Sequence, residues 1–125
     1  MHTLTYSDVL ARVAPLAEAR PDARPSCTYF ERDEEGGYSA DSPPSCIVGH
    51  AFAEEIRPLV VANHDVNTLR FTVLRNHLPE TFRFTAKAAA LLAVLQANQD
   101  AHQPWKTALA NAIEAIGTRY LSDNA

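Results

Sequence analysis

The last third of the chain constrains the fold most, because two apolar helical repeats follow each other there with only a short turn between them. After Thr85 as an N-cap, apolar side chains recur at spacings of three and four residues: Ala88, Leu91, Leu92 and Leu95. After Pro104, which suits a first helical turn, a second stripe ends at Gly117 and comprises Trp105, Ala108, Leu109, Ala112, Ile113 and Ile116. We expect helices over 86–101 and 104–117 that pack as an antiparallel helical hairpin.

The first two thirds of the chain predict three more helices. Thr5 is an N-cap for a helix over 5–19 with a kink at Pro15, and Ser45 caps a helix over 45–57 that Pro58 ends or bends. A third helix over 67–78, with Asn67 as its cap, rests on a mixed pattern in which strand and helix spacings alternate.

The segments between these helices predict a small β element and an exposed loop. Residues 26–30 suit a short strand, and 32–44 combine acidic residues with a glycine pair and a proline pair, which is typical of a mobile loop or hairpin tip. Residues 118–125 are polar and predict a frayed tail. The expected fold is mostly α (α+β), a single domain over 1–125 with about five helices and one short strand or hairpin.

Composition and charge exclude several classes of function. The net charge is −4 and the 11 basic residues are scattered, so the basic surface that nucleic-acid binding requires is not predicted. No apolar run is long enough to span a bilayer, and the N-terminal pattern is not that of a signal peptide. Cys27 and Cys46 are therefore expected to be free thiols in the cytoplasm.

Cys46 and His50 are the candidate catalytic residues, because they lie one helical turn apart and on the face opposite the apolar arc. A thiol at a helix N-terminus beside an imidazole can act as a nucleophile. The sequence supplies no orienting carboxylate or oxyanion donor, so the competing interpretation is that Cys46 and Cys27 pack as small apolar side chains and His50 is hydrogen-bonded. Gly49, between them in this helix, suits the close approach of another element.

A metal site is a second interpretation of the same residues. Cys27, Cys46 and His50 are possible zinc ligands, with a fourth available from His64, His77 or His102. The closely paired ligands that mark most zinc sites are absent, so no cofactor is predicted and zinc remains the alternative.

Two regions contain candidate binding residues. Gln99, Asp100 and Trp105 surround the turn between the last two helices, where they form either a polar pocket or a structural brace. The amides of Gln96 and Gln99 are expected either to meet buried partners or to lie where the helix emerges from the core. Arg57 lies on the polar face of its helix and is a further candidate.

Two segments carry a resemblance to a known family. They are Ser45-Cys46-Ile47-Val48-Gly49-His50-Ala51 and Gln96-x-x-Gln99-Asp100-x-x-x-Pro104-Trp105-x-x-Ala108. Together they resemble a family of small uncharacterised proteins of actinobacteriophages and their actinobacterial hosts. Members are often glycine-rich around the second segment, where this sequence has His102 and Lys106.

The resemblance implies a phage or prophage accessory protein in a bacterial cytoplasm, and it implies no reaction. With no complete catalytic constellation, we expect a non-enzymatic protein that binds a host or phage macromolecule, most simply a protein partner. The alternatives are a small thiol- or zinc-dependent protein that uses Cys46 and His50, and an oligomeric structural component.

Overall fold

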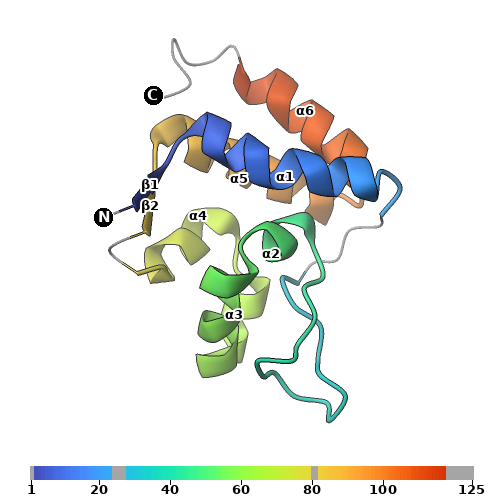
Figure 1. The fold of residues 1–125 in the computed structure, drawn as a ribbon, viewed down its shortest axis with the longest axis vertical. Coiled ribbons are helices and arrows are strands. Elements are labelled where there is room, and N and C mark those ends of the chain that lie inside the picture. The colour runs from blue at the N-terminus through green and yellow to red at the C-terminus, as the bar shows by residue number, and fades with distance from the viewer. Residues whose placement is uncertain (1, 24–27, 80–81, 118–125) are drawn as a thin grey trace.

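The computed structural model describes residues 2–23, 28–79 and 82–117. Figure 1 shows α1, α5 and α6 together in the upper part of the molecule, with α2, α3, α4 and the long loop before α2 below them. The elements are, in chain order, β1 (His2–Leu4), α1 (Tyr6–Ala19), α2 (Ile47–Ala51), α3 (Ala53–Ala62), the 3-10 turn η1 (His64–Thr68), α4 (Phe71–Leu74), the 3-10 turn η2 (Arg75–His77), β2 (Phe82–Phe84), α5 (Ala86–Asp100) and α6 (Trp105–Gly117). The fold is mostly helical with a small β element, as the sequence predicted.

The predicted first helix is confirmed. Thr5 accepts from the Asp8 amide and the Asp8 carboxylate accepts from the Thr5 amide, which is a complete capping box. Pro15 lies within α1, and the helix turns its apolar face inward through Tyr6, Val9, Val13 and Ala17. This face packs on α2, α5 and α6.

The predicted helical hairpin is also confirmed, with boundaries within one residue of those expected. The Thr85 side chain caps α5, and α5 and α6 pack along each other. The turn between them is held by Asn98, whose backbone oxygen accepts from the Gln103 amide and whose side chain donates to the Ala108 oxygen at 3.2 Å. His102 in this turn has φ 66°, a left-handed conformation that favours glycine. Trp105 is buried and anchors α6 in the core.

The strand predicted over 26–30 is wrong for the part that the structure describes, residues 28–30. Phe30 makes a single antiparallel bridge with Pro44, while the two strands of the sheet are β1 and β2, which pair in parallel with Thr3 opposite Arg83. Each strand has three residues, too few for alternation to be recognised in the sequence, and the pairing joins segments about 80 residues apart. Residues 26 and 27 lie outside the described part.

The helix predicted over 45–57 begins and ends elsewhere. Cys46, not Ser45, is the N-cap of α2. The helix is interrupted at Phe52, and α3 then continues past Pro58 to Ala62. Pro58 removes one hydrogen bond, but buried side chains before and after it, Ile56 and Val60, hold α3 against the core. The run 59–61, expected to lie between helices, therefore belongs to α3.

The single helix predicted over 67–78 is instead three short turns, η1, α4 and η2. Asn67 does not cap a helix. Its side chain is buried and pairs with the backbone of Phe30, accepting from the amide and donating to the oxygen at 2.9 Å each. Because the Asn67 side chain is paired with this distant segment, it does not start a helix, and residues 67–78 form several short elements instead.

The loop over 32–44 is closed at its base by backbone hydrogen bonds. The Glu31 amide donates to the Pro43 oxygen at 2.9 Å, and the Ser45 amide donates to the Tyr29 oxygen at 2.8 Å. Asp33 forms the tip by accepting from the amides of Glu35 and Gly37. The predicted tail, 118–125, lies outside the described residues. Within the described residues, no helix combines the length and the apolar character that crossing a bilayer requires.

Candidate functional site

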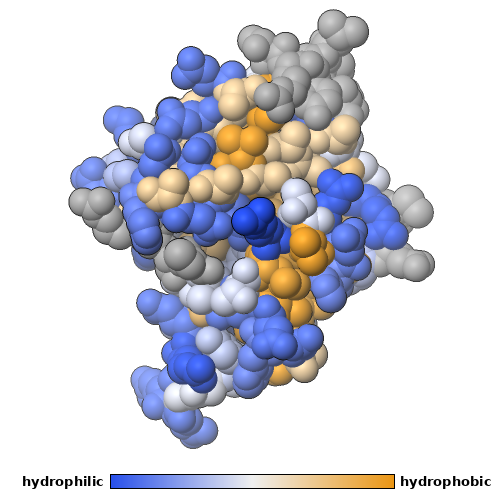
Figure 2. Space-filling model, turned by 180° about the vertical axis from the view of Figure 1, so that it is seen from behind, coloured by the Kyte–Doolittle hydropathy of each residue, from blue (hydrophilic) through white to orange (hydrophobic). Residues whose placement is uncertain are grey.

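An apolar groove runs along the outer side of α3, and we call it the α3 groove. It has a volume of about 510 Å³ and is lined by Ala40 from the loop and by Ala53, Glu54, Arg57, Pro58, Val61 and Ala62 from α3. Val61 is 39% exposed, which makes it one of the most exposed large apolar side chains of the described residues. Figure 2 shows that apolar residues reach the surface in the lower half of the molecule, where α3 and α4 lie.

Arg57 forms the wall of the groove next to the loop. Its Nε donates to the Ser42 oxygen at 3.0 Å, and its guanidinium lies 5.0 Å from the centre of the Phe30 ring. These contacts fix the 32–44 loop beside α3, so that Ala40 can complete the groove. The sequence predicted Arg57 as a binding residue, and the structure places it at this groove with its guanidinium engaged by the protein itself.

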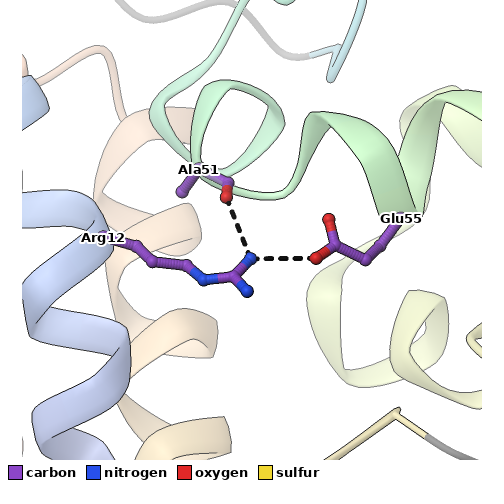
Figure 3. Close-up of polar contacts among 3 residues, drawn as sticks. All are labelled: Arg12, Ala51 and Glu55. Atoms are coloured by element: carbon purple, nitrogen blue, oxygen red, sulfur yellow. Dashed lines mark hydrogen bonds and ion pairs between the residues drawn. The ribbon is translucent and has the colours of Figure 1, made fainter.

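Arg12 of α1 holds the other end of α3. Its Nη1 donates to the Ala51 oxygen at 3.3 Å and to Glu55 Oε1 at 2.9 Å, across the break between α2 and α3 (Figure 3). The same guanidinium lies 4.9 Å from the centre of the Phe52 ring. The Ala51 oxygen is one of the carbonyls that the helix break leaves without a helical partner, so Arg12 satisfies it and orients α3 relative to α1.

Two acidic side chains lie at the α3 groove outside any described ion pair. Glu54 lines the groove and Asp41 follows Ala40, and both are exposed. Among the described residues the ion pair is that of Arg12 with Glu55, so neither Glu54 nor Asp41 is neutralised by a described basic residue. The α3 groove therefore presents an apolar floor bordered by charges of both signs, from Glu54 and Arg57.

The thiol of Cys46 is a poor nucleophile in this structure. Cys46 is 3% exposed and belongs to the core, which corrects the prediction that it lies off the core face. Its Sγ accepts from the Gly49 amide at 3.3 Å as the cap of α2. Burial raises the pKa of the thiol to about 12, although the hydrogen bonds from Gly49 and Val48 act in the opposite direction. The thiol is thus protonated at neutral pH.

The side chains of His50 and Cys46 have different partners, although His50 lies in α2 and Cys46 is the N-cap of the same helix. Its ring packs edge-on against Trp105, with the ring centres 5.1 Å apart. Partial burial lowers the His50 pKa, and Arg20 lowers it further, so the imidazole is neutral at pH 7. No hydrogen bond joins the side chains of His50 and Cys46, because the Cys46 sulfur accepts from the Gly49 amide instead.

The described residues contain no group of three His, Cys, Asp or Glu side chains close enough to hold a metal ion. Cys27, the third candidate ligand, lies outside the described residues. Of the candidate fourth ligands, His64 packs edge-on against Tyr38 at 4.8 Å, and all three histidines, His64, His77 and His102, are exposed.

The structure separates the predicted binding residues of the α5–α6 turn. Gln99 is buried toward α2, where its Oε1 accepts from the Ile47 amide at 3.2 Å. Trp105 is buried against His50, whereas Asp100 is exposed on another face. The Nε2 of Gln99 and the Nε1 of Trp105 have no hydrogen-bonding partner in the described part of the chain.

Gln96 finds buried partners, which is the first of the two arrangements expected for its amide. Its Oε1 accepts from the Phe71 amide and its Nε2 donates to the Tyr29 hydroxyl, which in turn donates to the Leu69 oxygen at 2.7 Å. Burial raises the pKa of the Tyr29 hydroxyl well above its ordinary value, so the hydroxyl remains a donor. This network attaches α5 to the segments before α4 and before α2.

Sequence reasoning missed the α3 groove, because ending the helix at Arg57 left Pro58, Val61 and Ala62 outside it. The signal was present: an exposed face of small and aliphatic residues one turn apart, continuing past the proline. Comparisons of the chain with known protein families, with curated proteins and with solved structures find no match.

Proposed function

We propose that this chain is a non-enzymatic accessory protein of phage or prophage origin that acts in a bacterial cytoplasm by binding a protein partner through the α3 groove. The observation that carries the proposal is the groove itself, a concave and mainly apolar surface of about 510 Å³ in which Val61 is 39% exposed. The phage origin rests on the resemblance of the segments 45–51 and 96–108.

A groove of this kind suits a protein partner for a physical reason. Binding surfaces combine a central apolar patch, where burial provides most of the favourable free energy, with a polar rim that excludes water. In the α3 groove the apolar side chains of Pro58, Val61 and Ala62 provide the patch, and Glu54 and Arg57 provide the rim. Because Arg12 holds α3 against α1 and Arg57 holds it against the 32–44 loop, a partner would meet a preformed surface.

The burial of the candidate thiol, Cys46, favours a binding function over a catalytic one. A nucleophilic cysteine requires a thiolate and an accessible sulfur, and Cys46 is buried with its pKa raised. The sulfur also has a structural task as the cap of α2.

The test is native mass spectrometry of the protein purified from its own host under reducing conditions, with three forms compared: wild type, Val61→Glu and Val73→Glu. Val73 is 45% exposed on α4 and lies outside the groove, so it is a matched control for adding a charge to an exposed valine. We expect a partner that accompanies wild type and Val73→Glu and is lost from Val61→Glu.

The same spectra report the alternatives. An increase in mass equal to one zinc ion that disappears in Cys46→Ser would support the zinc-dependent alternative. A mass equal to several copies of this chain, without another protein, would support an oligomeric structural component. A partner that still accompanies Val61→Glu, with the variant folded, would contradict binding through the α3 groove.

A further inference from the structure

A second pocket lies between α4 and the C-terminal half of α5, and we call it the α4–α5 pocket. It has a volume of about 420 Å³ and is lined by Arg70, which precedes α4, by Phe71 and Thr72 from α4, and by Ala93, Gln96, Ala97 and Asp100 from α5. This volume lies within the range of small-molecule sites. None of its lining residues belongs to the α3 groove.

The pocket places one free cation and one free anion at the same opening. Arg70 and Asp100 are both exposed, and Arg70 lowers the pKa of Asp100 while burial, the larger effect, raises it. They are close enough for this influence, yet no ion pair joins them, and the Arg70 side chain has no hydrogen-bonding partner among the described residues. Opposite charges that line one pocket without contact are available to a ligand that carries both.

Asp100 is also in an unfavourable place within its own helix. It is the last residue of α5, a 15-residue helix, where the helix dipole presents partial negative charge. A carboxylate at this end is repelled by the helix and is stabilised by a cation. Burial, the largest effect, raises the pKa of Asp100, and the nearby Arg70 lowers it, so a ligand cation beside this carboxylate would add to the stabilisation that Arg70 provides.

The rest of the pocket is rigid and apolar. The amide of Gln96 at its floor is already paired with Phe71, Tyr29 and Leu69, so this side chain is fixed. Ala93 and Ala97 form one wall, and the Phe71 ring is buried behind the other. Figure 2 shows a pale apolar band across the upper part of the face where α5 comes to the surface. A small aliphatic group fits against such a wall.

We propose that the α4–α5 pocket binds a small zwitterion with an aliphatic body, of the class of free amino acids and dipeptides. The ligand carboxylate pairs with the Arg70 guanidinium, the ligand ammonium pairs with the Asp100 carboxylate, and the aliphatic side chain lies on Ala93 and Ala97. The planar guanidinium suits a carboxylate because it can donate two parallel hydrogen bonds.

The test uses leucine and two blocked forms of it. N-acetyl-leucine keeps the carboxylate and lacks the ammonium, and leucinamide keeps the ammonium and lacks the carboxylate. Isothermal titration or amide chemical-shift titration of the full chain should show leucine binding about tenfold more tightly than either blocked form, with shifts at Thr72, Ala93 and Ala97. Leucyl-leucine in the same titration distinguishes a dipeptide from a free amino acid as the preferred ligand.

Two variants assign the charges separately. Asp100→Asn should bind leucine and N-acetyl-leucine equally, and Arg70→Gln should bind leucine and leucinamide equally, while Asp65→Asn and Arg75→Gln retain both preferences as exposed controls. Equal binding of all three ligands by wild type, or no binding of any of them, would overturn the proposal. Because Val61→Glu leaves this pocket unchanged, its result and this one are independent.

Discussion

Gly49 lies so close to the backbone of Tyr29 that a side chain at this position has no room. A Cβ atom built on Gly49 would be 2.2 Å from the Tyr29 oxygen and 3.0 Å from its carbonyl carbon. The same oxygen accepts from the Ser45 amide, so it is held in place at the base of the loop. The contact packs α2 directly on the segment before the loop.

Gly49→Ala should therefore be strongly destabilising. The added methyl group meets backbone that cannot rotate away, and overpacking of a core costs about 3 kcal/mol in such a case. Gly37→Ala is the control, because a Cβ there meets only the Asp33 carboxylate at 4.0 Å. Urea unfolding should separate the two variants. Equal midpoints would show that α2 can move away from Tyr29.

The hydrogen bonds of Gln96 predict a second stability effect. Gln96→Leu leaves the buried Phe71 amide without an acceptor and should cost about 3 kcal/mol, whereas Tyr29→Phe removes a hydroxyl together with its bonds and should cost about 1 kcal/mol. The double variant should cost less than the sum of the two. Strict additivity in urea unfolding would contradict a shared network.

His102 predicts a substitution that stabilises the protein. Among the described residues it is the non-glycine with a positive φ, 66°, and the left-handed conformation costs a side-chain-bearing residue about 1 kcal/mol. His102→Gly should therefore raise the free energy of unfolding by a net amount of about 0.5 kcal/mol, because the strain that is relieved exceeds the cost of a more flexible unfolded chain. His77→Gly, in η2 where φ is not positive, should lower it. A lower midpoint for His102→Gly would contradict this account of the turn.

The elements that the sequence predicted correctly depend on local signals. Thr5 with Asp8, and Thr85 before the apolar stripe of α5, define helix starts through side chains within four residues of each other. The elements that it missed depend on distant partners. Asn67 is held by Phe30, and β1 finds β2 across most of the chain. No local pattern specifies these pairings.

The candidate site shows the same contrast between local signals and distant partners. Spacing predicted that Cys46 and His50 share a face, but the helix break at Phe52 and the packing of Gly49 on Tyr29 turn the thiol into the core. Asp100 was identified from the α5–α6 turn, but its neighbour Arg70 comes from a segment that the sequence predicted as part of another helix. Which charges face each other is a property of tertiary packing.

The raised pKa of Cys46 predicts a pH dependence. The unfolded thiol loses its proton near its ordinary pKa of 9.0, and the folded thiol keeps it to about 12. Between these values deprotonation favours the unfolded state, so stability is full below pH 9 and falls as the pH rises toward 12.

The measurement is the free energy of unfolding of Cys27→Ser at pH 8 and pH 10.5, compared with Cys27→Ser/Cys46→Ala. Tyr29, whose pKa is raised chiefly by burial and only to a lesser degree by Cys46, is present in both proteins, so the difference reports mainly Cys46. The alanine variant loses the cap of α2 and should be less stable at pH 8, but it should lose less stability on going to pH 10.5. A parallel decrease in both would contradict a buried, protonated thiol.

The most direct measurement of the central claim is site-specific photo-crosslinking in the cells that make the protein, with a benzophenone-bearing phenylalanine analogue at position 61 or at position 73. Both positions carry exposed valines, and of the two only position 61 lies in the α3 groove. We predict one discrete protein adduct from position 61 and none from position 73, and the protein identified in that adduct should bind purified wild type and fail to bind Val61→Glu. An adduct from position 73 alone, or binding that Val61→Glu retains, would contradict a partner in the α3 groove.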